Sequence, residues 1–412
     1  MPGLLGWGVV LCAGCYDPPG FAKPSCGGVD LLGDDFTGTM RAPVWGRYPI
    51  DDFTGTTVAQ VGDLAVTPAA AMESFGAYFS QRRHDLRGGE ISVEVTEVLT
   101  PAPMSVTYLV AAGPDGTRDQ AGIGTVDGRL LCLWRAAGSE EYGCSGVAYS
   151  STAHRWWRLR EQDGTAYWET SADPAAGPWE KQFERPAPAW FQYALIEIGA
   201  GHRDQQASPA GTARFDNVNG GTASGSWCPA ADFVDPFDGG IDPVRWAYRN
   251  VSACTVDDGT SDVSITAPAG TDPFDCWFGA SAAYDLTDSS VTLEVTAVDT
   301  ASTAASYLWV TDFGGTHMLV IRQERGMLYF DQDRTPVGTP VPWDATTHRY
   351  WRIAHDGGQI RFRTSGGMGS WQDHHSAAIG FPVDGVLVYF GVYANSAVLS
   401  PATSTFAGLN TP

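Results

Sequence analysis

A six-residue stretch occurs twice in this chain, and its recurrence limits the possible folds more than any other feature. Residues 154–159 read His-Arg-Trp-Trp-Arg-Leu, and residues 348–353 read His-Arg-Tyr-Trp-Arg-Ile. A Gly-containing turn and a second alternating segment follow each copy, a pattern that predicts a β-hairpin. Side chains alternate between the two faces of a strand, so one set must be buried. The predicted core residues of the two hairpins are Trp157, Leu159, Trp168, Trp351, Ile353 and Phe362.

The rest of the chain repeats with the same displacement of about 200 positions. Residues 91–96, Ile-Ser-Val-Glu-Val-Thr, match residues 291–296, Val-Thr-Leu-Glu-Val-Thr. A period this long indicates two tandem domains rather than a solenoid of short units, and 412 residues suffice for two cores. We expect the domains to span residues 31–220 and 232–412, with residues 221–231 as a linker.

Composition favours an all-β fold. The sequence contains 49 Gly and 26 Pro, many short alternating segments, and no sustained helical periodicity. Each repeat also opens on Asp-x-Phe with a Trp about ten residues later, at Asp34 to Trp45 and at Asp235 to Trp246. Together with the His-Arg-aromatic-Trp-Arg strand and a Thr-Ser turn leading to Trp, this resembles the concanavalin A-like lectin/glucanase family in its laminin-G-like bacterial form.

That resemblance implies two tandem jelly-roll β-sandwiches, each built from two antiparallel sheets. Such sandwiches often bind carbohydrate on a concave face or at edge loops. The same fold hosts lectins, glycosidases and inert spacers, so the resemblance does not fix an activity.

Six of the eight cysteines fall into plausible pairs. We predict the disulfides Cys26–Cys228, Cys132–Cys144 and Cys254–Cys276, which indicate an oxidising compartment and therefore export. The alternative is buried free thiols in the cytosol. It is less favoured, because no Cys-x-x-Cys motif or Cys/His cluster provides a metal or redox role.

The remaining two, Cys12 and Cys15, lie at the N-terminus. Residues 1–14 are apolar and end in small residues, which resembles the signal peptide of a bacterial lipoprotein, although a basic segment is missing. In that family the Cys is lipidated, so Cys15 is the predicted lipid attachment site and residues 15–30 the predicted Pro/Gly-rich tether. A plain secretory leader or a buried first strand are the alternatives. We expect an outer-membrane or cell-surface lipoprotein, otherwise a secreted protein.

The charge of the chain limits its partners. It has 47 acidic and 25 basic residues, a formal net charge of −22. Nucleic-acid-binding proteins concentrate positive charge on one face, so we expect no nucleic-acid partner. The same charge argues against binding to anionic lipid, which leaves the N-terminal anchor as the expected membrane contact. It also disfavours self-association, so we expect a monomer.

Catalytic residues are not evident. Glycoside hydrolysis needs two facing carboxylates, and the nearest candidates are Glu90, Glu94 and Glu97, of which the second repeat keeps only Glu294. Alternation places Glu94 on a solvated face. No Gly-x-Ser-x-Gly motif occurs, and the equivalent His154 and His348 suggest a shared structural hydrogen bond. We therefore predict no catalytic residue and a protein that is not an enzyme.

Outward-facing aromatic and arginine side chains are the predicted ligand-binding residues. They are Trp156, Arg158, Tyr350 and Arg352, which alternation directs away from the core. A ring can stack on a sugar while Arg binds hydroxyl groups. The equally weighted alternative is that loops or the interdomain contact cover them, with Arg stacked on the ring.

Calcium is the possible cofactor that the resemblance implies, confined to the first domain. Asp35 and Asp216 match a pattern in which the first and last strands of such sandwiches hold Ca²⁺, whereas the second repeat has Pro236 and Ala407 there. The slightly favoured alternative is that both Asp residues shape turns.

Taken together, these patterns predict a non-catalytic exported protein that binds carbohydrate or another cell-surface ligand. The alternative is a structural or protein-interaction spacer, and a glycoside hydrolase is the least favoured.

Overall fold

The computed structural model describes most of the chain from Cys26 onward. The described residues are 26–39, 41–48, 56–70, 74–99, 104–113, 119–136, 138–144, 146–203, 211–259, 261–270, 273–396 and 398–411. The predicted leader, the lipid attachment site Cys15 and most of the tether lie outside them, so those predictions stay predictions. Within the described part, no helix is long and apolar enough to span a membrane.

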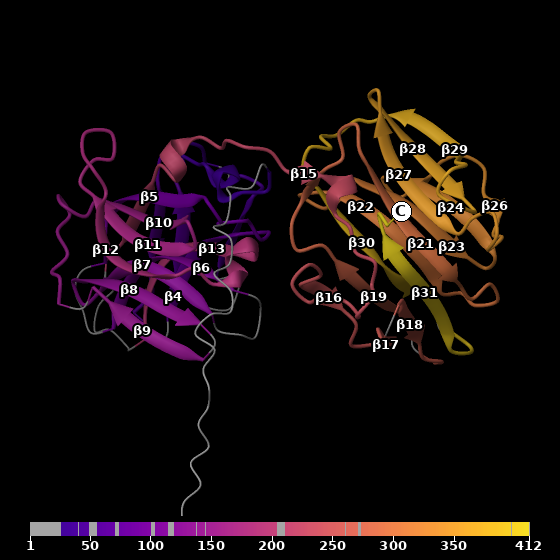
Figure 1. Ribbon diagram of the computed structural model, residues 1–412, viewed down its shortest axis with the longest axis horizontal. Coiled ribbons are helices and arrows are strands. Elements are labelled where there is room, and N and C mark those ends of the chain that lie inside the picture. Colours follow the sequence, from indigo (N-terminus) through magenta and orange to yellow (C-terminus); the bar gives the residue numbers. More distant parts are fainter. Residues whose placement is uncertain are drawn as a thin grey trace, which may run out of the picture.

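The first half of the chain forms a sandwich of two antiparallel sheets, drawn in indigo to magenta in Figure 1. Sheet A contains, in spatial order, β1 (Trp45–Tyr48), β4 (Ser74–Ser80), β13 (Leu195–His202), β6 (Ser105–Ala112), β7 (Gln120–Val126), β8 (Arg129–Ala136) and β9 (Ser139–Gly143). Sheet B contains β12 (Glu180–Pro186), β11 (Thr165–Ser171), β10 (Trp156–Gln162), β5 (Glu90–Glu97), β14 (Ala213–Asp216), β3 (Leu64–Thr67) and β2 (Thr57–Gln60).

The second half forms a second sandwich beside the first (Figure 1). Sheet C contains β15 (Cys228–Pro229), β20 (Tyr284–Asp285), β30 (Val386–Ala394), β22 (Ala305–Asp312), β23 (Met318–Glu324), β24 (Met327–Gln332) and β25 (Thr335–Pro336), with β19 (Phe274–Gly279) and β16 (Tyr248–Asn250) extending it beside β30 and β26 (Val341–Pro342) pairing with β24. Sheet D contains β17 (Thr255–Asp257), β18 (Val263–Ala267), β31 (Ala402–Leu409), β21 (Ser290–Ala297), β27 (Tyr350–Asp356), β28 (Gln359–Ser365) and β29 (Gln372–Ala378).

Helical structure in the described chain is limited to short 3₁₀ turns at η1 (Val29–Leu32), η2 (Ala189–Tyr193), η3 (Asn219–Gly221) and η4 (Ala230–Asp232). The predicted fold class, two tandem all-β jelly-roll sandwiches, is confirmed. Each sandwich has its own apolar core, one drawn from Val29 to Val218 and the other from Ala230 to Leu409. The residue boundaries predicted for the domains remain predictions.

The repeated hairpins are buried as alternation predicted. Trp157, Trp168 and Trp351 are fully buried. Each hairpin begins with the same local structure: the backbone N–H of Ser150 donates to His154 Nδ1 at 3.1 Å, and that of Asp344 donates to His348 Nδ1 at 3.0 Å. The shared structural hydrogen bond expected of the two histidines is therefore present.

The structure contains the three predicted disulfides, Cys26–Cys228, Cys132–Cys144 and Cys254–Cys276. The first joins residues 202 positions apart, at the two ends of the first sandwich. Three disulfides indicate an extracellular or periplasmic protein.

Candidate functional site

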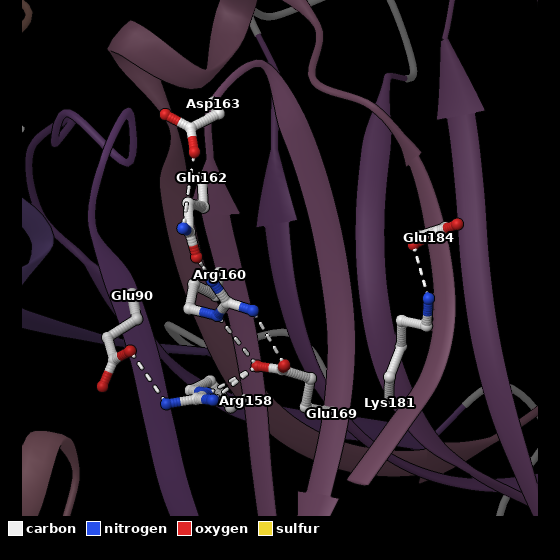
Figure 2. Close-up of polar contacts among 8 residues, drawn as sticks. All are labelled: Glu90, Arg158, Arg160, Gln162, Asp163, Glu169, Lys181 and Glu184. Carbon is white, nitrogen blue, oxygen red and sulfur yellow. Dashed lines mark hydrogen bonds and ion pairs between the residues drawn. The ribbon is translucent and has the colours of Figure 1, made fainter. Parts of the chain in front are cut away.

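The predicted ligand-binding residues of the first repeat lie on the face of sheet B that points away from the core. Strand β10 carries half-buried Trp156 and Arg158 there, between the buried Trp157 and Leu159. Figure 2 shows Arg158 between two carboxylates: its Nε donates to Glu169 at 2.7 Å and its Nη1 to Glu90 at 2.9 Å. Its guanidinium also lies 4.2 Å from the ring centroid of Trp179. The stacking partner of this Arg is thus Trp179 rather than Trp156.

The ion-pair network continues along β10 to Arg160. Arg160 donates to the Glu169 carboxylate at 3.0 and 3.1 Å (Figure 2). Burial raises the pKa of Glu169, but the hydrogen bond from Arg160 and the charges of both arginines outweigh burial, so the net pKa lies below its ordinary value. Glu169 therefore stays ionised at neutral pH and cannot act as a general acid.

A groove of about 570 Å³ opens beside this network. Trp156 and Trp179 provide its rings, and its charged lining residues are mostly acidic, with Asp30, Asp85 and Glu90 beside Arg160. Glu161, which also lines it, is buried and accepts hydrogen bonds from the backbone N–H groups of Gly88 and Gly164, which is a structural role. The ring of Trp156 is therefore not covered completely within the chain, as the predicted binding role requires.

The expectation that Glu94 is solvated is wrong. Its side chain is 9 % exposed, its Oε1 accepts from Arg155 Nε at 2.5 Å, and its Oε2 accepts from Asn217 Nδ2 at 2.6 Å. The second repeat conserves the pair as Arg349 and Glu294, at 2.6 Å. Alternation gave the correct face but could not show that a neighbouring Arg would cover it.

The corresponding place in the second repeat has a different charge environment. Arg352 lies 3.7 Å from the ring centroid of Trp371, and its Nε donates to Thr292 Oγ1 at 2.8 Å. Among the described residues, no carboxylate forms an ion pair with Arg352. Burial and the nearby charge of Arg363 lower its pKa to about 10. Tyr350 is half-buried on the same face.

Asp35 and Asp216 lie at the same end of the first sandwich and both shape turns. Asp35 Oδ1 accepts from the backbone and hydroxyl of Thr37, and Asp216 Oδ1 accepts from the backbone N–H of Asn217 at 2.8 Å. Burial raises the pKa of Asp216, and the charges of Glu94 and Asp35 add to that effect. In the described chain no three His, Cys, Asp or Glu side chains are grouped to hold a metal ion. Calcium binding stays a prediction.

A second candidate surface lies on the face of sheet C that points away from the core. We call it the aromatic platform, and it consists of Trp277, Tyr307, Trp309, Tyr389 and Tyr393. Their neighbours along the strands, such as Leu308 and Phe390, belong to the core of the second sandwich, whereas the platform rings do not. Except for Tyr307, which is 3 % exposed, the platform residues are half-buried.

The platform rings contact one another across three strands. Trp309 of β22 and Trp277 of β19 each lie 5.3 Å, centroid to centroid, from Tyr389 of β30. Tyr307 lies 6.3 Å from Trp309 and 5.6 Å from Tyr393. Gly391 sits in register between Trp277 and Tyr307, and a Cβ there would lie 2.1 Å from the carbonyl oxygen of Cys276. Glycine is therefore required at that point, and no side chain separates the rings.

Charged groups border the platform. Tyr307 donates its hydroxyl to Asp275 at 2.9 Å, and burial raises the pKa of Asp275. Arg322 Nε donates to Asp331 at 2.7 Å and its Nη1 to Glu324 at 2.6 Å. A carboxyl group with a raised pKa is what a general acid needs, and a hydrolase also needs a second carboxylate on the other side of the bond. The other two carboxylates at this border, Asp331 and Glu324, are both hydrogen-bonded to Arg322.

Sequence reasoning did not find the platform. Residues 306–311 read Ser-Tyr-Leu-Trp-Val-Thr, where aromatic and aliphatic residues alternate. Because both sets are apolar, alternation does not show which set faces the core. The signal that could have found it is the spacing of Tyr and Trp by two or four positions within a strand, at Tyr307 and Trp309 and at Tyr389 and Tyr393.

No family model and no curated protein matches this chain. Several solved structures are similar to it. One is described as an immunostimulatory antigen and pseudo-β-1,3-glucanase of Mycobacterium tuberculosis, 14 % identical, covering 47 % of this chain and 98 % of that one with a TM-score of 0.35. Another is a prokaryotic β-1,3-1,4-glucanase from a mouse hindgut metagenome, with 12 % identity, coverages of 45 % and 96 %, and a TM-score of 0.34. A third is an alginate lyase of polysaccharide lyase family 7, with 15 % identity, coverages of 44 % and 96 %, and a TM-score of 0.29.

These structures contradict the prediction that the chain is not an enzyme, because they include a β-1,3-1,4-glucanase and an alginate lyase. That prediction is withdrawn. Likeness at these identities and TM-scores also assigns no activity to this chain, so polysaccharide cleavage has to be measured directly.

Proposed function

We propose that the protein binds a polysaccharide, and that the aromatic platform of the second sandwich is the main contact. The observation that carries this proposal is the row of contacting rings on the face of sheet C opposite the core. Four of the five rings keep part of their surface open to solvent, and a ligand that covers it gains the free energy of burying apolar surface.

The chemistry of the platform suits a sugar chain. The apolar face of a pyranose packs on an aromatic ring, and removing apolar surface from water contributes roughly 25 cal/mol per Å². Hydroxyl groups need hydrogen-bond partners beside the rings. Asp275 and Arg322 are placed to supply them at the border of the platform.

The test is a panel of soluble polysaccharides screened for binding by affinity electrophoresis, with product release measured on the same panel. The best ligand is then titrated by calorimetry against the parent, Trp309→Ala and Trp309→Phe. We expect Trp309→Ala to weaken binding about tenfold, which corresponds to about 1.4 kcal/mol. Trp309→Phe should retain most of the affinity, because a ring remains in place. Equal affinity of the parent and Trp309→Ala would reject the platform as the site.

Binding at the outer face of sheet B, through Trp156 and Arg158, remains a separate prediction of where the polysaccharide binds. Trp156→Ala removes a ring from the groove on sheet B and leaves the platform intact. If the sheet B face holds the ligand, Trp156→Ala weakens binding and Trp309→Ala does not. A protein that binds and cleaves nothing on the panel would instead support the spacer alternative.

Attachment of lipid at Cys15 remains part of the proposal for location. The three disulfides support export. Mass spectrometry of the protein from membranes checks it: a mature chain that starts at lipid-modified Cys15 is expected, and an unmodified N-terminus elsewhere would reject the anchor.

A further inference from the structure

The two sandwiches meet through a cluster of polar contacts at the end of β4. The backbone N–H of Arg83 donates to the carbonyl of Ser281 at 3.0 Å, and the hydroxyl of Tyr248 donates to the carbonyl of Gln81 at 2.9 Å. Arg82 extends from the first sandwich into the second, where its Nη2 donates to the hydroxyl of Tyr389 at 2.8 Å and its guanidinium lies 4.3 Å from the ring centroid of Tyr248. Tyr389 belongs to the aromatic platform, so Arg82 connects the platform to the first sandwich.

Two adjoining hollows open on the first-sandwich side of Arg82. One, of about 430 Å³, is lined by Arg41, Arg47, Arg82, Phe79 and Tyr248, and the other, of about 650 Å³, shares Arg41 and Arg47. We call the pair the junction groove. Rings from both sandwiches, Phe79 and Tyr248, form part of its wall, so the groove is complete only when the two sandwiches are together.

The junction groove is positively charged in a strongly acidic protein. Its described lining residues include three arginines and no Asp or Glu. Among the described residues, none of the three arginines forms an ion pair with a carboxylate, and the Nε of Arg82 is buried with no hydrogen-bond partner. In contrast, Arg158, Arg160 and Arg322 are each neutralised by carboxylates. Arg82 donates to Tyr389 and Arg47 Nη1 donates to the carbonyl of Val58 at 3.5 Å, but neither bond neutralises the guanidinium charge. Arginines without a carboxylate partner around a hollow are suited to bidentate recognition of an anion.

We propose that the junction groove binds the acid groups of an anionic polysaccharide whose chain continues onto the aromatic platform. The inference rests on the proposed function and specifies its ligand class: a sugar chain that carries carboxylate or sulfate groups. Phe79 and Tyr248 provide ring faces for the sugars, and Arg41 and Arg47 provide guanidinium groups for the acid groups. Arg82 lies where the two surfaces meet. Because the net charge of −22 repels polyanions over long range, a local cluster of arginines is needed to hold one.

The groove favours an acidic sugar chain over a nucleic acid. A nucleic-acid site needs an extended row of positive charge along the phosphate backbone, and the groove offers three arginines in a protein with nearly twice as many acidic as basic residues. A single-stranded oligonucleotide is nevertheless included in the test as a competing polyanion.

The test compares Arg41→Gln/Arg47→Gln with Arg325→Gln/Arg334→Gln in the full chain. Both double variants remove the same charge from exposed positions, and the second pair lies in turns of the second sandwich, away from the groove lining. Arg82 is left intact because it joins the sandwiches. The ligands are uronic-acid oligosaccharides of several backbones, their carboxyl-reduced neutral forms and their O-sulfated neutral forms, titrated by calorimetry. Thermal unfolding confirms that each variant folds.

The parent is expected to bind an acidic oligosaccharide about tenfold more tightly than its neutral form, because a hydrogen bond between a guanidinium and an acid group is stronger than one to a neutral hydroxyl. Arg41→Gln/Arg47→Gln should abolish this preference without changing affinity for the neutral form, and the control pair should retain it. The uronate and sulfate arms show which acid group is recognised.

Three results overturn the inference. Binding of neutral and acidic forms with equal affinity rejects the junction groove and leaves the proposed function standing. An acid preference that survives Arg41→Gln/Arg47→Gln places the anion site elsewhere. Binding of the oligonucleotide but of no oligosaccharide replaces the sugar with another polyanion and rejects the proposed function as well.

Discussion

At the scale of single residues, burial decides which ion pairs matter. Glu169 has a side chain only 6 % exposed and accepts from two arginines, whereas Glu184, in its pair with Lys181, is 50 % exposed (Figure 2). We expect Glu169→Gln to lower the free energy of unfolding by about 2 kcal/mol, because Arg158 and Arg160 lose a charged partner in a partly buried place. Glu184→Gln is the matched control and should leave stability unchanged. Urea denaturation measures both, and equal effects would contradict the account.

His84 should make stability depend on pH. It is fully buried, its Nδ1 lies 3.3 Å from the carbonyl oxygen of Gly28, and burial lowers its pKa to about 4. The unfolded chain takes up a proton below pH 6.5 while the folded chain does not, so the contribution is present above pH 6.5 and is lost as pH falls to about 4. The loss amounts to roughly 3 kcal/mol.

His84→Gln should flatten the stability curve over that pH range, whatever it does to stability at pH 7. Denaturant titrations at several pH values check this. An unchanged slope between pH 6.5 and pH 4 would show that His84 is not the group responsible.

For single residues, the sequence could predict which face of a strand a side chain lies on, but not which residue it contacts. Alternation predicted that Trp157, Trp168 and Trp351 are buried, because a strand has only two faces. It could not predict the partner of Glu94, since Arg155 reaches it from the segment before a neighbouring strand. Pairing across strands depends on register, which the repeat alone does not specify.

At the scale of strands, the same limit explains why the aromatic platform was missed. The hairpins β10–β11 and β27–β28 alternate between apolar and charged residues, so their core face was evident. In β22 and β30 the outward residues include Tyr and Trp, and hydrophobicity does not distinguish them from the inward Leu, Val and Phe.

Close packing of β19 and β30 at Gly391 leads to a sharp stability prediction. Gly391→Ala would place a Cβ against the backbone at Cys276, so we expect a loss of about 3 kcal/mol or failure to fold. Gly367→Ala is the control, because no atom lies within 4 Å of the added Cβ and φ is not in the left-handed region. Chemical denaturation of both variants is the measurement, and an unaffected Gly391→Ala would contradict the strand packing described.

The disulfide Cys254–Cys276, which lies at β19, should stabilise the second sandwich by a similar free energy. Replacing Cys254 and Cys276 with Ser releases a loop constraint, which the loop-entropy model values at about 3 kcal/mol. The second sandwich should then unfold at a lower denaturant concentration than in the parent. Coincident unfolding curves for the two proteins would reject a stabilising role for the bridge.

At the scale of the whole molecule, the sequence predicted two sandwiches but not how they meet. The repeat at 200 positions, with Cys26 and Cys228 at the two ends of the first copy, was sufficient to predict two sandwiches. The junction uses Arg82, Tyr248 and Tyr389, which come from three distant segments and belong to no repeated motif. Such a contact can be recognised only once the two sandwiches have been placed together.

The most direct test of the central claim is the affinity of Trp309→Ala for the best polysaccharide on the panel, measured beside Tyr142→Ala. Tyr142 is an isolated ring, 55 % exposed, on the first sandwich, and it controls for the loss of any surface aromatic. If the aromatic platform binds the sugar chain, Trp309→Ala weakens binding about tenfold while the protein still unfolds cooperatively, and Tyr142→Ala binds like the parent. Parent-like binding by a folded Trp309→Ala protein would contradict the account.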